Sequence, residues 1–414
     1  MGILINIYFL FFSLITILNR GGSAIGFGYL NISLLSLLLS ALIYFLITKG
    51  KQIIRDLTVL IFISISLIIT FNHINYFGLN ASAIRSTGVL IYPLTLLAGI
   101  SLSRGRLVSK TLNLLKFIFP ICIIYGLFAT VLKPILIGKV IINGISLFGI
   151  YGSYYTITTL AFNFFFSGYG GIKNIRRYSL LGAAAILVTG GRAALLGLST
   201  SFFITLNNRA RSFLSKKVIY TLFLSLILIS IVILFVFPIF RREGLRNTFT
   251  IEYYWKAFLS IFSDSDSFSS GFIGSRRHRI LMLNKTLDLI FGDIKNFFFG
   301  IPFGINYTGA LFNDPHNGLL SLFARGGIFT ITSFAFLQFQ IFTRALKIKK
   351  ILGPNPFSTF SLCFIFSSLI FSTVSTILTA PMNAIPYYFV LGHIWEMNNF
   401  YLDKIKINNL ETSI

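Results

Sequence analysis

The feature that most constrains this chain is a series of long apolar runs, separated by short clusters of charge or of Gly, Pro and Asn. A membrane-spanning helix needs about 20 mostly apolar residues, and several runs reach that length. Only 11% of the residues are charged, whereas soluble domains average about 25%. The chain has too few charges to cover a surface that faces water, so we expect an all-α polytopic membrane protein.

The boundaries of the runs predict about twelve transmembrane helices. They fall near 3–19, 26–48, 57–71, 86–103, 112–131, 148–170, 177–190, 192–207, 218–240, 316–343, 356–378 and 384–401. Residues 1–240 then hold nine helices, 316–403 hold three, and 404–414 form a tail. The first run lacks the basic start and cleavage site of a signal peptide, so we expect it to remain as the first helix.

The basic residues predict the orientation of these helices. The chain has 35 Lys and Arg against 11 Asp and Glu, and bases collect in cytoplasmic loops. One set of alternate connections carries nineteen of them, whereas the short loops of the other set carry only Arg20, Arg85, Lys133, Lys139 and Arg192. This split places both termini in the cytoplasm and requires a turn at Gly190 and Gly191. Bases arranged in this way argue against a nucleic-acid partner.

One connection, 241–315, is far longer than the others and falls on the non-cytoplasmic side. It holds seven of the eleven acidic residues. Long loops escape the positive-inside rule and are usually functional. Within it, 255–262 and 279–291 have helical amphipathic spacing on either side of a hinge at 263–275 that is rich in Ser, Asp and Gly. We therefore expect the chemistry of the protein in this loop.

The segment Asn-Asp-Pro-His-Asn at 313–317 leads into an apolar run. An Asp or Asn followed by Pro is typical of a helix start, which would put His316 in the first turn of a membrane helix. Unpaired N–H groups there favour anions and a neutral imidazole that can accept a proton. The alternative is an interfacial histidine beside an ordinary cap. Of the other histidines, His73 falls in a short outer loop and His278 among arginines.

Arginines form the second group of candidates. Arg192 opens an apolar helix, and its planar guanidinium suits a phosphate or pyrophosphate. Arg276, Arg277 and Arg279 repel one another unless an anion lies between them. The simpler alternatives are an arginine that anchors a helix end and a solvated run of charge. Arg325 would lie ~13 Å below the membrane surface, where it needs a partner or a polar cavity.

Several kinds of chemistry leave no trace in the sequence. It has no nucleotide-binding motif, no metal-ligand spacing and no Gly-x-Ser-x-Gly elbow. Acidic residues are almost absent from the predicted spans, which argues against a proton-driven transporter. Cys122 and Cys363 both lie in apolar runs, so we expect no disulfide framework. We expect neither a metal ion nor a cofactor.

Three local patterns, in this order around a long outer loop, resemble the bacterial O-antigen ligase/polymerase superfamily. They are "TGGRAALLGL" (189–198), the arginine-started helix and Phe-Gly turn at 274–304, and "PHNGLLSLFARGGIFT" (315–330). The resemblance covers about 177–345. It implies a GT-C-like glycosyltransferase of the bacterial inner membrane, with a periplasmic active site, no metal and no nucleotide sugar. Its partners would be an undecaprenyl-diphosphate-linked oligosaccharide, membrane lipids and a chain-length regulator.

The resemblance also assigns roles to residues. It implies that His316, Arg279 and Arg192 are catalytic, with Arg276 as an alternative to Arg279. The diphosphate would be bound by Arg192, Arg276, Arg277, Arg279 and Asn317. The chain departs from the family at Gly191, where Ser is common, and at Arg325, where an acid or other polar residue is common. The chemistry of glycosyl transfer is consistent with these roles. Negative charge develops on the departing diphosphate, and cations stabilise it there.

Three functions remain open. The Ile-, Phe- and Asn-rich composition and the "FFFGIPFG" turn favour an O-antigen polymerase, which joins lipid-linked repeat units. The complete His-Asn pattern favours an O-antigen ligase, which transfers the glycan to lipid A–core. A lipid-linked oligosaccharide flippase would instead have its cations inside the bundle and short outer loops.

Overall fold

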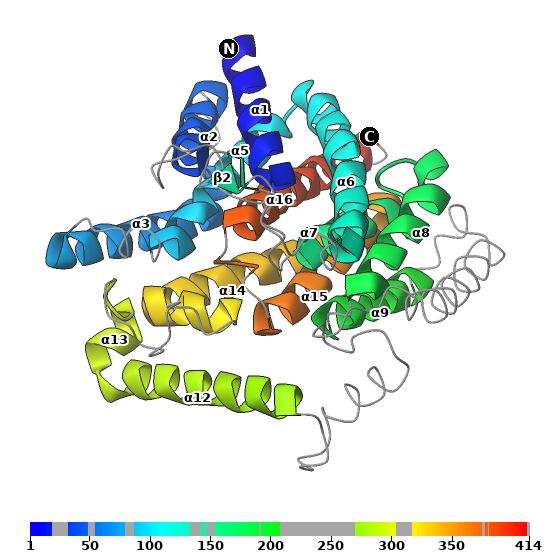
Figure 1. Ribbon diagram of the computed structural model, residues 1–414. Coiled ribbons are helices and arrows are strands. Elements are labelled where there is room, and N and C mark those ends of the chain that lie inside the picture. The colour runs from blue at the N-terminus through cyan, green and yellow to red at the C-terminus, as the bar shows by residue number, and fades with distance from the viewer. Residues whose placement is uncertain are drawn as a thin grey trace.

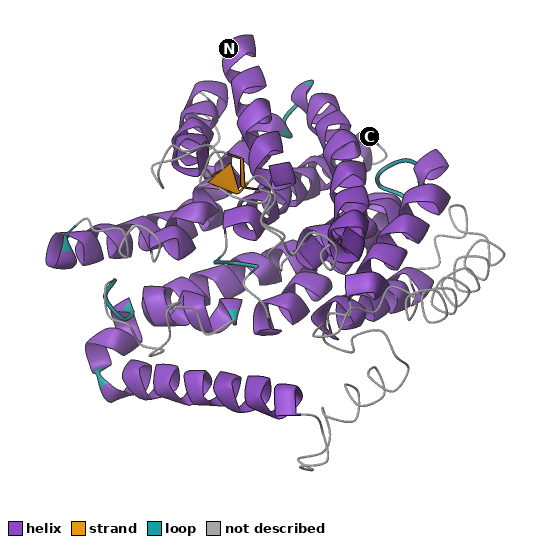
Figure 2. Cartoon of the chain, viewed as in Figure 1, coloured by secondary structure: helices purple, strands orange, loops and turns teal. Residues whose placement is uncertain are grey.

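The computed structural model describes residues 1–18, 32–48, 54–78, 87–132, 141–142, 145–146, 154–189, 192–207, 270–303, 317–374, 377–379 and 381–411. Its first helices are α1 (Gly2–Leu18), α2 (Ile32–Thr48), α3 (Leu57–Phe77), α5 (Thr95–Leu102), α6 (Leu107–Leu132), α7 (Tyr154–Phe166), α8 (Ile172–Thr189) and α9 (Arg192–Asn207). They are followed by α12 (Ser270–Gly292), α13 (Ile294–Phe299), α14 (Gly318–Leu352), α15 (Pro356–Val374) and α16 (Pro381–Glu411). The predicted all-α architecture is confirmed for this part of the chain (Figures 1 and 2).

The remaining described elements are short. Two 3-10 turns, η1 (Ile54–Asp56) and η2 (Tyr92–Leu94), precede α3 and α5, respectively. One antiparallel pair joins β1 (Ile141–Ile142) to β2 (Ile145–Ser146). The expected span at 218–240 and the expected helix at 255–262 lie outside the described residues.

Four described helices are long and apolar enough to cross a membrane: Leu57–Tyr76, Leu107–Leu127, Gly318–Leu352 and Pro356–Thr373. Shorter apolar helices accompany them, among them Gly2–Ile17 and Thr87–Leu102. Large apolar side chains such as Phe45, Ile68 and Phe339 are exposed on these helices. A helix in a bilayer turns apolar side chains toward lipid, so this surface is that of a helical membrane protein.

The centre of the assembly is the contact between α5 and α16 (Figure 1). A Cβ atom at Gly99 would collide with the carbonyl oxygen of Phe389, and one at Gly392 with that of Leu96. Glycines at these two positions let the helix backbones approach closely, as small residues do between membrane helices. Helix α16 also packs against α14 and α1, and α14 packs against α15 and α3.

Helix α14 is interrupted at Gly327, whose backbone angles are φ 64° and ψ −171°. The turn that follows α13 fills this break. The N–H of Ile301 donates to the carbonyl oxygen of Ala324 at 2.5 Å, and Gly300, with φ 83°, passes against the backbone of Arg325. Positive φ favours glycine at both positions. The Phe-Gly turn and the interrupted helix therefore form a single structural unit.

Candidate functional site at the junction of α12, α13 and α14

The start of α14 is fixed by Asn317, which is the N-cap of the helix. Its side-chain Oδ1 accepts a hydrogen bond from the N–H of Leu320 at 2.9 Å. Helix α14 therefore begins at Gly318, two residues after the predicted start of this span at 316. The physical reason is the choice of cap, because Asn317 takes the role that the Asp-Pro pattern suggested for Asp314. His316 itself lies outside the described residues.

An apolar cluster joins α12 and α13 to the first turns of α14. Its buried members are Ile290, Ile301, Leu320 and Ala324. The ring of Phe323 on α14 lies 6.1 Å from that of Phe291 on α12 and 5.9 Å from that of Phe297 on α13, measured between centroids. The second and third sequence patterns are thus packed together, so the arginine-bearing helix and the helix that starts beside His316 share a core.

Arg325 is buried beneath this junction, with 1% of its surface exposed. Its Nη1 donates to the carbonyl oxygens of Ile301 at 3.2 Å and Pro302 at 2.9 Å. The guanidinium carbon also lies 5.9 Å from the centre of the Phe303 ring. The prediction that Arg325 needs a partner is confirmed, and the Phe-Gly turn supplies it. This arginine stabilises the turn.

His73 lies beside Arg325 and not in an outer loop, so the prediction for this residue is wrong. Helix α3 continues to Phe77 and carries His73 into the protein, where its ring meets the edge of Phe303 at 4.5 Å between centroids. The polar residues Asn72, His73 and Asn75 end the apolar run in the sequence. They do not end the helix, because the His73 side chain is buried.

The predicted arginines lie on two helices. Arg192 is the first residue of α9, which packs against α15, α7 and α8. Arg276, Arg277 and Arg279 lie in the first half of α12. Their side chains lie outside the described part of the structure. Helix α15 contacts both α9 and α14, so it is the element that connects the first pattern to the other two.

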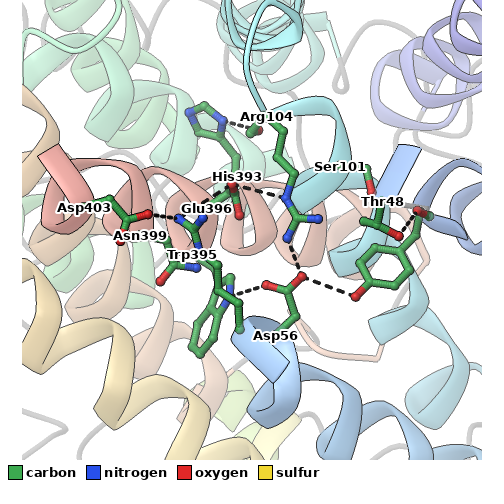
Figure 3. A network of polar contacts seen from close by, with 12 residues as sticks. Thr48, Asp56, Ser101, Arg104, His393, Trp395, Glu396, Asn399 and Asp403 are labelled. Atoms are coloured by element: carbon green, nitrogen blue, oxygen red, sulfur yellow. Dashed lines mark hydrogen bonds and ion pairs between the residues drawn. The ribbon is translucent and has the colours of Figure 1, made fainter. Parts of the chain in front are cut away.

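A buried ionic cluster was missed by the sequence analysis (Figure 3). Arg104, in the turn between α5 and α6, bonds to the carboxylate of Asp56, and its Nε lies 3.2 Å from Oε1 of Glu396. Asp56 also accepts from the indole N–H of Trp395 at 3.2 Å and the hydroxyl of Tyr44 at 3.3 Å. These five residues, here named the Arg104 cluster, tie α2, η1, the α5–α6 turn and α16 together.

Arg104 remains charged in this environment. Burial lowers its pKa, but the carboxylates of Glu396 and Asp56 outweigh that effect and raise the pKa above its usual value. At the edge of the cluster, Arg55 lies 3.0 Å from the half-exposed carboxylate of Asp403. The signal in the sequence was the scarcity of acids, since Asp56 and Glu396 stand at the ends of apolar runs in a chain with only 11 acidic residues.

His393 is a buried structural residue of α16, three residues before Glu396. Its Nδ1 lies 2.6 Å from the hydroxyl of Ser103, and its Nε2 lies 2.9 Å from the hydroxyl of Tyr169. Both ring nitrogens therefore have partners in the core. Within the described ranges, no group of three or more His, Cys, Asp or Glu could hold a metal ion.

Comparison of the chain with protein-family models and with curated protein sequences finds no match in either. The resemblance of the three patterns to the O-antigen ligase/polymerase superfamily therefore stands as a hypothesis about function.

Proposed function

We propose that the chain is a bacterial inner-membrane glycosyltransferase that polymerises undecaprenyl-diphosphate-linked O-antigen repeat units. In this proposal it has about twelve spans in a GT-C-like arrangement, with both termini in the cytoplasm and its site at the periplasmic face. The observation that carries the proposal is the core shared by α12, α13 and α14, which holds the arginine-bearing helix against the helix that starts beside His316. Lipid-linked glycan, membrane lipids and a chain-length regulator would be its partners.

The proposed reaction needs cations to stabilise the leaving group and a base to accept a proton. A hydroxyl oxygen of the acceptor sugar attacks the anomeric carbon of the donor, and the bond from that carbon to the diphosphate breaks. The electron pair leaves with undecaprenyl diphosphate, whose growing charge Arg192 and Arg279 would stabilise. His316 would take the proton of the attacking hydroxyl. Asn317 uses its Oδ1 to cap α14, so its amide N–H group is the part that would face the ligand.

An O-antigen ligase is the alternative within the same chemistry, favoured by His316 followed by Asn317. It would use the same donor and transfer the glycan to lipid A–core. Deletion of the gene separates the two functions. Loss of a polymerase leaves core with a single repeat unit, whereas loss of a ligase leaves bare core and lipid-linked polymer. Bare core would overturn the proposed polymerase activity.

A flippase is the third candidate, and the buried cations Arg104 and Arg325 bear on it. Both are bound by protein groups, Arg104 by two carboxylates and Arg325 by two carbonyl oxygens. Neither arrangement suits a cation that must bind and release a passing substrate. Purified protein in vesicles without an ion gradient should lengthen lipid-linked repeats. Translocation of the lipid-linked glycan with no change in its length would contradict an enzyme.

A further inference from the structure

Helix α12 has more apolar surface than the protein covers. Its buried stripe, spaced by one helical turn, consists of Met282, Thr286 and Ile290. Apolar side chains beside this stripe are exposed at Ile280, Leu283 and Phe291, and two more are exposed at Leu281 and Leu289. The exposed polar residues are Asn284, Lys285 and Asp288; Asn284 and Asp288 are close to Phe291 around the helix, whereas Lys285 lies farther from it. The apolar surface of α12 is therefore only partly packed against the described parts of the protein.

The exposed apolar surface continues without a break onto a membrane span. On α13, Ile294 is 72% exposed, and the exposed rings of Phe298 and Phe299 lie 5.7 and 5.9 Å from the ring of Phe329 on α14. Phe329 is itself exposed, and the same face of α14 continues with Phe336 and Phe339. Helix α14 is one of the four candidate spans. Figure 1 shows α12 at the edge of the assembly, joined to it through α13.

We infer that α12 and α13 form an interfacial membrane anchor, with the exposed apolar face of both helices inserted into the lipid bilayer. Phe336 and Phe339 lie on the lipid-facing side of the span α14, where they contact acyl chains. The rings of Phe298 and Phe299 on α13 continue this surface and therefore lie at the level of the bilayer. A continuous apolar patch of this kind is rare on a surface that faces water. Exposed aromatic and aliphatic side chains with a lysine among them, here Lys285, are typical of helices that lie in the membrane interface.

Lipid explains this surface better than a second protein does. The exposed apolar surface of α12 and α13 continues onto the membrane span α14 through the contacts of Phe298 and Phe299 with Phe329. A protein interface would instead be bordered by a polar rim. The anchor does not depend on the proposed enzymatic reaction. If that reaction is correct, the anchor also holds Arg276, Arg277 and Arg279 near the phosphate layer of the membrane, where a lipid diphosphate lies; this consequence alone rests on the proposed function.

The inference can be tested with a spin label at one position on each face of α12. We would make Phe291→Cys among the exposed apolar side chains and Lys285→Cys, about 120° round the helix from it, as its matched control. The full-length protein is labelled and placed in vesicles of phosphatidylethanolamine and phosphatidylglycerol. The two native cysteines are buried, so the unmutated protein gives the labelling background. Collision of each label with oxygen, which dissolves in lipid, is compared with collision with a water-soluble nickel chelate.

We expect the ratio of oxygen to nickel collisions to be several-fold higher for the label at Phe291 than for the label at Lys285. Equal access of nickel to both labels would show that water covers this face and would overturn the inference. Protection from both reagents would mean that protein covers it, which overturns the inference as well. Ile294→Cys on α13 repeats the test if the Phe291 variant exposes its native thiols. Because no step measures catalysis, failure here is distinct from failure of the proposed enzymatic activity.

Discussion

The guanidinium of Arg325 donates a 2.9 Å hydrogen bond to the carbonyl oxygen of Pro302, and this bond ties the interrupted part of α14 to the turn after α13. The same nitrogen donates to Ile301 at 3.2 Å. Carbonyl dipoles and the face of Phe303 stabilise a cation that is almost fully buried. The turn in front of the candidate site is therefore held in place by a charge that belongs to the protein.

We expect Arg325→Ala to lower the melting temperature of the protein. The substitution leaves the carbonyl groups of Ile301 and Pro302 without their donor, which costs about 1–3 kcal/mol, and it also creates a cavity. Lys347→Ala on the exposed side of the same helix is the matched control and should change little. Unfolding is followed by the reaction of the buried native thiols with a fluorescent reagent during heating. Equal melting temperatures for the two variants would contradict the role given to Arg325.

Gly327→Ala should be destabilising for a different reason. The backbone at Gly327 has φ 64°, and a Cβ there would collide with the carbonyl group of Phe298. Strain of this kind costs about 1–3 kcal/mol, and displacement of α13 adds to it. Gly292→Ala is the control, since a Cβ at that position meets no described atom within 4 Å. The same thermal measurement applies, and a Gly327 variant as stable as the Gly292 variant would show that α13 does not pack into the break.

The sequence predicted helices well wherever an apolar run ends at a strong local signal. Pro356 opens α15 at the predicted residue. At the end of α3 the local signal was misleading, because Asn72 and His73 interrupt the hydropathy while the helix continues. What stabilises His73 there is the ring of Phe303, which belongs to a turn far away in the sequence. A contact of this kind cannot be predicted from residues that are close together in the sequence.

The candidate site likewise combines features that local residue types predict with features that only distant contacts determine. The helix start near His316 could be predicted from residue types, although the structure assigns the cap to Asn317. The Arg104 cluster could not be predicted from residue types, because Asp56 and Glu396 come from opposite ends of the chain. Counting charges in loops treats Arg104 as solvated, and only the packing of α5 on α16 shows that it is an ion-pair partner.

Removal of one charge from the Arg104 cluster should be strongly destabilising. Asp56 is fully buried, and Asp56→Asn leaves the guanidinium of Arg104 without one of its two carboxylates. Breaking a buried pair in this way costs about 3–5 kcal/mol. Asp403→Asn is the control, because its side chain is 53% exposed and a pair of that kind contributes less than about 1 kcal/mol. If both variants melt at the temperature of the unmutated protein, the cluster does not stabilise the fold.

If the proposed reaction is correct, Arg192→Lys and Arg279→Lys should weaken catalysis without unfolding the protein. Lysine keeps the positive charge but loses the bidentate contact with a phosphate, at a cost of about 1–3 kcal/mol in transition-state stabilisation. The measurement is the rate of repeat-unit addition by protein in vesicles, with the melting temperature taken alongside. Arg106→Lys, in the turn after α5, gives a basic residue outside the proposed site as the comparison. A normal rate from both site variants would remove the arginines from the diphosphate site.

His316→Ala should reduce the rate by about 10²–10⁴, because the attacking hydroxyl loses the group that accepts its proton. Binding of the lipid-linked donor should change much less, since the arginines remain. His278→Ala is the matched control; His73→Ala is unsuitable, because His73 packs on Phe303 beside Arg325. The measurement is the distribution of glycan chain lengths on a gel at equal expression of each variant. Normal ladders from His316→Ala would remove this histidine from the mechanism and leave Asp314, two residues before it, as the next candidate base.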